Sequence, residues 1–335
     1  MKRKEMIFLI VIMIFGTVLS GCRTKEPARP TDDSPQVEMP DEDTSENDRI
    51  SIVATLFPQY DFARTIGGVH VDVRYLLPTG TEAHSYEPTP QDMVALLNAD
   101  VFLYTGELME PWTVNIVSNL EDEDVMIVDL SQDISLLTNE DHDHEHDDED
   151  EHDDEEEVYD PHYWTDPNMA IIMVNRITES LVEIDPENRD EYQENGDKLK
   201  ADLKELDDDI REALAKTKSK TILSGGHFAF GYFAKQYGLE HMSPYTGFSP
   251  NAEPTPQRIT ALINTINETG AMAIFHEELI DPKVAQVIVE ETGVKMLLLH
   301  GAHNISKEEL DSGKTYIEIM YDNLENLKEG LGYEE

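Results

Sequence analysis

The chain has 335 residues and a formal net charge of −46, because 71 acidic residues outnumber 25 lysines and arginines. A protein this acidic lacks the basic surface that a phosphate backbone requires, which excludes nucleic acid as a partner. With one cysteine in the chain, an intramolecular disulfide is also excluded.

The first 22 residues have the order of a secretory signal. A basic start, Lys-Arg-Lys at positions 2–4, precedes an apolar run from Met6 to Leu19 that is too short to span a bilayer, which takes about 20 residues. Small residues follow, and the order predicts a signal peptide over 1–21. The sequence Leu-Ser-Gly-Cys that ends it resembles a bacterial lipobox. We therefore expect lipid on Cys22 and attachment to the extracellular face of the cell membrane, with no cysteine left for a metal site.

Residues 22–48 are rich in proline, acidic residues, serine and threonine and poor in apolar residues. Such a segment buries too little surface to offset its ordering entropy, so we expect a flexible stalk. Regular apolar segments begin at residue 49. The remaining chain of about 290 residues is long enough for two modest lobes.

Strand-like and helix-like segments then alternate. Buried or alternating apolar runs predict strands at 50–55, 69–76, 101–104 and 125–130, and helical spacing predicts helices at 60–66, 89–98 and 169–184. Alternation of this kind indicates a parallel sheet with crossover helices. The pattern predicts an N-terminal α/β lobe over 49–184.

A long helix is predicted over 185–217. Asp185 and Pro186 are typical of a helix start, and apolar residues then recur at spacings of three, four and seven with only Gly196 as a breaker. At 1.5 Å per residue it reaches roughly 45 Å, enough to join two lobes. A second α/β lobe follows over 218–335, with strands at 221–224, 271–275 and 294–299 and helices at 227–237, 255–269, 282–291 and 316–331.

Several histidines occupy loops that follow predicted strands. They are His84, His162, His227, and the pair His300 and His303. In open α/β sheets ligands bind beyond the carboxyl ends of the strands, and a cleft between two lobes is the default pocket. Imidazole nitrogen is a preferred ligand of Zn²⁺. The shared placement predicts a metal site. His70 and His241 are interpreted as surface or strand-edge residues, and His276 belongs to an incomplete His-Glu-x-x-His motif, since position 280 is isoleucine.

Three motifs together indicate a family. They are Pro-Thr-Gly-x-x-x-His-x-Tyr-Glu-Pro at 78–88, Asp-Pro-His-Tyr-Trp-Thr-Asp-Pro at 160–167 and Gly-His-x-Ala-Phe-x-Tyr-Phe-Ala at 226–234. From about residue 50 to 331 the chain resembles the zinc/manganese solute-binding lipoproteins of bacterial ABC transporters, the ZnuA-like group. The resemblance implies two α/β lobes joined by one long backbone helix, and a metal held between them by His84, His162 and His227. It also implies delivery to the membrane permease of an ABC metal importer.

The fourth ligand departs from the family pattern. The resemblance implies an Asp or Glu in the last strand-to-loop segment, where this chain has His303 at the matching place and His300 three residues earlier. We expect His303 to be the ligand, with His300 as the alternative. A site made of imidazoles favours Zn²⁺, whereas Mn²⁺ prefers carboxylate oxygen. The prediction is therefore a monomeric, high-affinity zinc receptor, with a manganese receptor of the same family as an alternative.

Residues 140–157 contain only Asp, Glu and four histidines: His142, His144, His146 and His152. We expect a disordered loop over 138–158. Many zinc members of the family carry a comparable His-rich loop, so these histidines are candidates for auxiliary, low-affinity zinc binding.

Four protein ligands leave no open coordination position for catalysis, so a binding protein is predicted and not an enzyme. One alternative is a lipid-anchored zinc hydrolase with Glu87 or Glu277 as its base. Another is an adhesin-like surface protein that binds metal incidentally. Candidates for orienting the histidines are Asp160, Asp166 and Glu87, and Glu277 is a candidate for orienting or shielding the site.

Overall fold

The computed structural model describes residues 49–120, 123–138, 159–245, 254–279 and 281–335. The expected signal peptide, Cys22, the stalk and the four histidines of the acidic tract lie outside these residues. All of the described residues belong to one compact unit. Among the described residues, no helix is both long enough and apolar enough to cross a bilayer.

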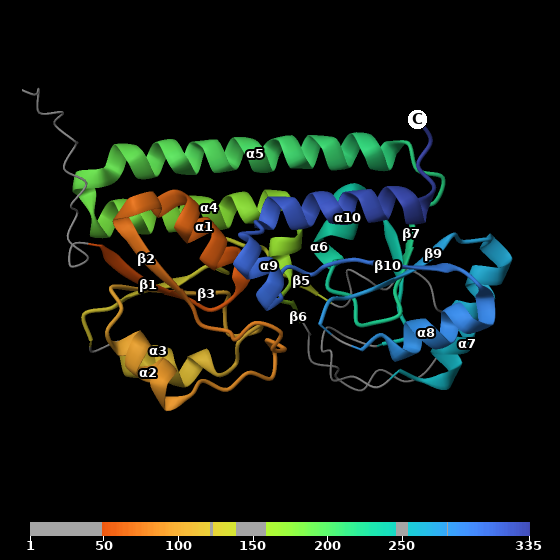
Figure 1. The fold of residues 1–335 in the computed structure, drawn as a ribbon, viewed down its shortest axis with the longest axis horizontal. Coiled ribbons are helices and arrows are strands. Elements are labelled where there is room, and N and C mark those ends of the chain that lie inside the picture. The colour runs from red at the N-terminus through yellow and green to blue at the C-terminus, as the bar shows by residue number, and fades with distance from the viewer. Residues whose placement is uncertain (1–48, 121–122, 139–158, 246–253, 280) are drawn as a thin grey trace, which may run out of the picture. The chain divides into compact units, whose positions relative to one another are not determined.

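The N-terminal lobe is built on a four-stranded parallel sheet. Its strands, β1 (Ile50–Ala54), β2 (Val71–Tyr75), β3 (Val101–Tyr104) and β4 (Met126–Asp129), have the spatial order β2-β1-β3-β4. Helices α2 (Pro90–Leu97) and α3 (Thr113–Leu120) lie on one side of the sheet, and α1 (Phe57–Gly67) lies on the other (Figure 1). Every residue of β3 is buried, as expected for a central parallel strand covered on both faces.

The C-terminal lobe repeats this topology with shorter strands. Parallel pairs form between β7 (Thr221–Leu223) and β8 (Glu240–Met242) and between β9 (Ala273–His276) and β10 (Lys295–Leu298). A bridge between Ser224 and Phe275 joins the two pairs, so the order along the sheet is again second, first, third, fourth. Its helices are α6 (Gly231–Tyr237), α7 (Pro256–Thr269), α8 (Lys283–Thr292), α9 (Lys307–Ser312) and α10 (Tyr316–Leu331).

Two long helices lie above the sheets, and the longer of them extends over both lobes (Figure 1). Helix α4 (Pro167–Ile184) turns through a short 3₁₀ segment (Pro186–Asn188) into α5 (Arg189–Ala215). With 27 residues α5 is about 40 Å long, and it packs on α4, α1 and α10, so that one helix contacts both lobes (Figure 1). The predicted two-lobed α/β fold with a long joining helix is confirmed, although α5 begins at Arg189 rather than at residue 185.

Several local predictions were incomplete. Residues 227–230 precede α6 instead of belonging to it, and they are buried without the exposed face that a surface helix leaves. The sequence analysis also missed α3, α9, β8 and a small hairpin between β5 (Leu137–Thr138) and β6 (Tyr159–Asp160). These elements are short, and their apolar patterns cover too few residues to separate helix from strand.

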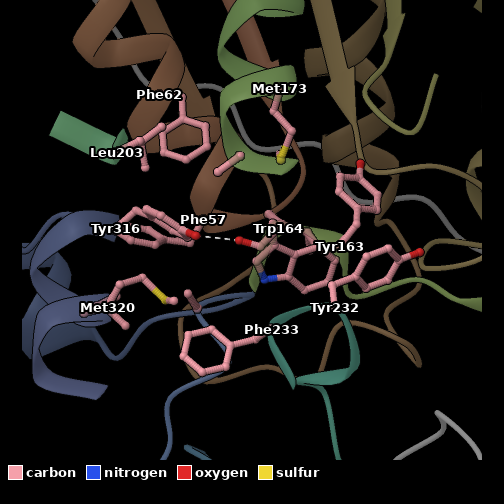
Figure 2. Close-up of a cluster of buried hydrophobic side chains, with 14 of the residues drawn as sticks. Phe57, Phe62, Tyr163, Trp164, Met173, Leu203, Tyr232, Phe233, Tyr316 and Met320 are labelled. Atoms are coloured by element: carbon pink, nitrogen blue, oxygen red, sulfur yellow. Dashed lines mark hydrogen bonds between the residues drawn. The ribbon is translucent and has the colours of Figure 1, made fainter. Parts of the chain in front are cut away.

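The two lobes share one hydrophobic core around Trp164 (Figure 2). Its indole N–H donates to the carbonyl of Gly301 over 2.8 Å, and its own carbonyl accepts from the Tyr316 hydroxyl over 2.5 Å. Tyr316 also packs edge-on against Phe62 of α1, with 5.0 Å between ring centroids. Its backbone N–H, at the start of α10, donates to Asp61 of α1. The lobes are therefore in direct contact and do not depend on α5 alone.

Gly196 lies where α5 approaches α4 closely. A Cβ at this position would lie 2.5 Å from Oγ1 of Thr178 on α4, a buried side chain that donates to the Val174 carbonyl. We predict that Gly196→Ala destabilises the protein by about 1–3 kcal/mol through overpacking, although alanine normally favours a helix by about 1 kcal/mol.

Urea unfolding of the metal-free protein measures this effect. In a Thr178→Ala background, which removes the nearest atoms, Gly196→Ala is expected to be neutral or stabilising. A stabilising effect of Gly196→Ala in the wild type contradicts the close approach of α4 and α5.

Candidate metal centre

His84 lies in the loop between β2 and α2. Glu82 accepts hydrogen bonds from the backbone N–H groups of His84 and Ser85, each over 3.1 Å, which fixes the turn that carries the imidazole. The same loop is held from the C-terminal lobe, because the Asn304 side-chain amide donates to the carbonyls of Pro78 and Thr81. The loop is therefore fixed by its own acidic side chain and by the opposite lobe.

His162 is the most enclosed of the predicted ligands, with an exposed fraction of 1%. It follows β6, where Oδ1 of Asp160 lies 2.9 Å from its backbone nitrogen and 2.8 Å from its Nδ1. The carbonyl of Asp160 in turn accepts from the Tyr232 hydroxyl over 2.9 Å. With Nδ1 donating to a carboxylate, Nε2 carries the free lone pair, and this nitrogen lies 3.1 Å from Nε2 of His84.

His227 follows β7 on the C-terminal lobe. Its Nδ1 contacts a carboxylate oxygen of Glu277, the first residue after β9. The preceding residue is Gly226, and its lack of a side chain leaves room for Glu277: a Cβ there would lie 2.6 Å from the other carboxylate oxygen. His227 and Glu277 thus follow two neighbouring strands of the C-terminal sheet and meet beyond their carboxyl ends.

The structure brings His84, His162 and His227 together. One nitrogen from each ring lies within 4.8 Å of the other two. The ring centroids are 5.1 Å apart for His84 and His162, 5.5 Å for His162 and His227, and 6.2 Å for His84 and His227. Nitrogen ligands of a tetrahedral zinc lie about 3.3 Å apart, given Zn–N distances near 2.0–2.1 Å. Small movements of the rings are therefore enough to form three corners of such a site.

The protonation of these rings favours a cation. Burial and the neighbouring His162 lower the pKa of His84 to about 2, and burial together with His227 lowers the pKa of His162 well below its usual range. Burial also disfavours charge on His227, but the Glu277 carboxylate outweighs it and the net pKa is raised. Because a metal requires neutral imidazole, His84 and His162 are ready to bind without releasing a proton.

His303 and His300 both lie in the loop after β10, but their surroundings differ. A small cavity is lined by His227, Glu277, Glu278 and His303, and it does not include His300. In His300, Nδ1 accepts from the Ala302 N–H over 3.0 Å and Nε2 lies 4.0 Å from Glu309. His303 belongs to the walls of the site beside His227, although it is outside the cluster of three. Its role as fourth ligand stays a prediction.

The remaining described histidines have other partners. Nε2 of His70 lies 2.9 Å from Glu191, His241 stacks on Phe228 with centroids 4.0 Å apart, and Nδ1 of His276 faces the Glu277 carbonyl over 2.9 Å. None of the three belongs to the cluster found among the described residues.

Two of the carboxylates proposed from sequence do not orient a histidine. Asp166 caps α4, where its carboxylate accepts from the backbone and side-chain amides of Asn168. No hydrogen bond or ion pair among the described residues joins Glu87 to His84.

Glu278, which the sequence analysis overlooked, is buried beside His303 and His300. Burial raises its pKa, but the two histidines and the Gly301 N–H outweigh this and the net pKa is lowered. Its position directly after β9 was the available signal, since the same criterion selected the histidines.

Comparison with known proteins identifies the family. Residues 52–330 match the family described as zinc-uptake complex component A, periplasmic, or ZnuA. This chain belongs to that family. It is 37% identical over 287 residues to the high-affinity zinc uptake system protein ZnuA of Bacillus subtilis (strain 168), covering 86% of this chain and 89% of that protein.

Two pneumococcal comparisons extend the match. The zinc-binding lipoprotein AdcA of Streptococcus pneumoniae (strain R6) is 31% identical over 284 residues, which cover 84% of this chain but 56% of AdcA, so the chain spans about half of that relative. The crystal structure of the Zn(II)-bound ZnuA-like domain of Streptococcus pneumoniae AdcA superposes with a TM-score of 0.71 at 29% identity, covering 84% of this chain and 99% of that domain. The family match therefore includes a structure determined with zinc bound.

We predict that Asp160→Asn lowers zinc affinity by about 10- to 100-fold, the usual cost of losing the partner behind a ligating histidine. An asparagine amide no longer secures the proton on Nδ1 of His162. Competition titration with a chromophoric chelator measures the change.

Asp166→Asn is the matched control, because Asp166 is a buried carboxylate of the same loop that caps a helix, and asparagine caps equally well. Equal losses of zinc affinity in the two variants would mean that the loop, and not the Asp160–His162 contact, is responsible.

Proposed function

We propose that this protein is a high-affinity zinc receptor that captures Zn²⁺ outside the cell and delivers it to an ABC importer. Zinc is the cargo, held by His84, His162, His227 and His303. The observation that supports this best is the convergence of three imidazoles from three separate loops on two lobes, within 4.8 Å, of which His162 and His227 are buried and His84 is half-buried. Membership of a zinc-uptake family and likeness to a Zn(II)-bound domain also support a zinc receptor.

The ligand chemistry favours zinc over manganese. Imidazole nitrogen suits Zn²⁺, whereas Mn²⁺ prefers oxygen donors. The carboxylates of Asp160 and Glu277 lie behind the imidazoles, on Nδ1, and add negative charge without supplying oxygen to the metal. This arrangement offers a divalent cation a nitrogen shell with carboxylates behind it.

A receptor fits the site better than a hydrolase. A catalytic zinc needs an open position and a free general base close to the bound water. The carboxylate of Glu277 already meets Nδ1 of His227, and no hydrogen bond or ion pair among the described residues joins Glu87 to a cluster histidine. With four protein ligands the metal is enclosed, which suits capture and transfer.

Delivery requires a place at the membrane. The relatives include a zinc-binding lipoprotein, and the family description is periplasmic, which supports a membrane-associated extracellular location. We propose that lipid on Cys22 anchors a monomer at the cell surface, where the permease of an ABC importer receives the ion. The stretch at 22–48 serves as the stalk, and the lobes at 49–184 and 218–335, with the helix at 185–217 between them, form the receptor body.

We predict one tight zinc site per mature chain that withstands excess Mn²⁺. His162→Ala is expected to weaken it by more than about 100-fold, beyond the usual cost of losing only an outer partner. His303→Ala is expected to weaken it as well and His300→Ala to leave it nearly unchanged. Competitive titration with metal analysis of the purified protein measures these affinities.

His70→Ala, a histidine paired with Glu191 away from the cluster, is the control. Preference for Mn²⁺ would overturn the zinc assignment, and chelator-sensitive ester or peptide turnover would favour the hydrolase. If His162→Ala binds zinc like the wild type, the site itself is wrong.

We also propose that His142, His144, His146 and His152 collect zinc weakly for the main site. Deleting 140–157 is predicted to leave the tight site intact and to remove additional weak zinc equivalents. The segment has acidic and imidazole groups that bind zinc, but no apolar residue that could enclose the metal in a buried site. Isothermal titration at zinc excess counts the sites. Unchanged stoichiometry and affinity in the deletion variant would reject the auxiliary role.

A further inference from the structure

Glu278 is a buried carboxylate beside the site for which the proposed function has assigned no role. Its side chain is 5% exposed, and Oε2 accepts from the Gly301 N–H over 2.7 Å. The other oxygen, Oε1, lies 3.2 Å from Nδ1 of His303 and 3.5 Å from Nδ1 of His300, with no well-aligned hydrogen bond among the described residues. An ionised buried oxygen without a hydrogen-bond donor is costly, so we expect one of these two rings to donate an N–H to Oε1.

The neighbouring contacts select His303 as that donor. Nδ1 of His300 already accepts the Ala302 N–H, so in the neutral ring this nitrogen has no proton to give. No described hydrogen bond engages Nδ1 of His303, which is also the nearer nitrogen. A small rotation of the His303 ring aligns an Nδ1–H with Oε1 of Glu278.

The backbone of this loop makes room for the contact. A Cβ at Gly301 would lie 3.1 Å from Nδ1 of His303 and 3.4 Å from Oε1 of Glu278, so only glycine leaves the space between them open. The next residue, Ala302, has a left-handed φ of 58°, an unfavourable conformation for a residue with a Cβ. Such strain persists only where surrounding contacts over-determine the backbone.

The same arrangement occurs at two other histidines of the site. Asp160 meets Nδ1 of His162 and Glu277 meets Nδ1 of His227, which leaves Nε2 of each ring available. We propose that Glu278 is the third such positioning residue: it holds the proton on Nδ1 of His303 and thereby presents Nε2 to the metal as the fourth ligand. This inference rests on the proposed function, whose fourth ligand it orients.

The arrangement also affects metal choice. Consecutive residues Glu277 and Glu278 leave β9 and meet histidines from the loops after β7 and β10, so two carboxylates lie outside the ligand shell. They compensate the charge of the cation while only nitrogen touches it, and nitrogen ligands select Zn²⁺ over Mn²⁺. Glu278 therefore contributes to specificity through His303.

The loop itself does not depend on Glu278 alone. The backbone of His300 exchanges two hydrogen bonds with the Asn323 side chain, over 2.7 and 2.8 Å. The Gly301 carbonyl accepts from Trp164, and the His303 carbonyl accepts from the Phe57 N–H over 3.1 Å. Changing Glu278 is therefore expected to release the ring of His303 and to leave the loop in place.

The first test uses the metal-free full mature chain. Long-range ¹H–¹⁵N spectra of histidine-labelled protein report which ring nitrogen carries the proton, and His303→Gln assigns the signals. We expect the Nδ1–H form for His303 in the wild type and loss of that preference in Glu278→Gln. The Gly301 N–H meets Oε2 and Nδ1 of His303 lies near Oε1, so a glutamine that keeps its oxygen on Gly301 presents its NH₂ group, which is a donor, to His303.

Glu278→Asp keeps both oxygens and the charge, so it is expected to retain the Nδ1–H form at least in part. Glu308→Gln, which neutralises an exposed residue after the same loop, is the matched control and should leave the His303 signals unchanged. An Nε2–H form in the wild type, or an unchanged tautomer in Glu278→Gln, overturns the proposal.

The second test is a double-mutant cycle on zinc affinity. Glu278→Gln is expected to weaken binding about 10- to 100-fold in the wild type and to have no further effect in a His303→Ala background. If the losses of zinc affinity in the two single variants multiply in the double variant, Glu278 acts independently of His303, through the loop. If His303→Ala is harmless and Glu278→Gln is severe, Glu278 is itself the ligand. Either result overturns the proposal.

A different measurement tests the receptor function. Unchanged zinc affinity in His84→Ala would reject the site as a whole, whereas the tautomer of His303 is read without metal. The two failures are therefore distinguishable.

Discussion

The hydrogen bond from the Trp164 indole to the Gly301 carbonyl joins the two lobes where their histidine loops meet. Trp164 lies two residues after His162, and Gly301 lies two residues before His303. Both partners are buried, so neither polar group has water as a substitute, and breaking this bond without a replacement is costly. The position of one lobe's loop relative to the other is therefore set inside the shared core, and the long helices above it reinforce a contact that already exists.

The chemistry of the site depends on this enclosure. Burial and mutual proximity lower the pKa of His84 and His162, so both rings can bind a metal without first losing a proton. Asp160 and Glu277 contact Nδ1 of His162 and His227, which leaves Nε2 of each ring available, and we propose the same role for Glu278 at His303. Asp160 approaches from the N-terminal lobe, and Glu277 and Glu278 approach from the end of β9 in the C-terminal lobe. In the proposed function, a cation held by these imidazoles meets nitrogen first and negative charge behind it.

The duplicated topology explains how unrelated sequence segments form one site. In each lobe four parallel strands follow the same order, and their carboxyl ends supply loops to the space between the lobes. His84 follows β2, His227 follows β7, and His303 follows β10, whereas His162 follows the small β5–β6 hairpin. The strands contribute buried apolar side chains and the register of the sheet, and none of those described contains a candidate ligand. The chemistry is confined to the loops, where a single residue change alters a ligand without altering the sheet.

By itself the sequence determined the fold class, the long joining helix and the loops that carry the histidines, because apolar periodicity and strand ends are local properties of the chain. It also identified Asp160 beside His162, since the two are neighbours in sequence. Only the tertiary structure decided that Glu277 meets His227, that Glu278 lies behind His303 and that His300 is turned toward Glu309. These pairings join residues from loops that follow different strands, or a loop and a helix, and their geometry depends on sheet register and on how the loop after β10 enters the core. No local pattern encodes those distances.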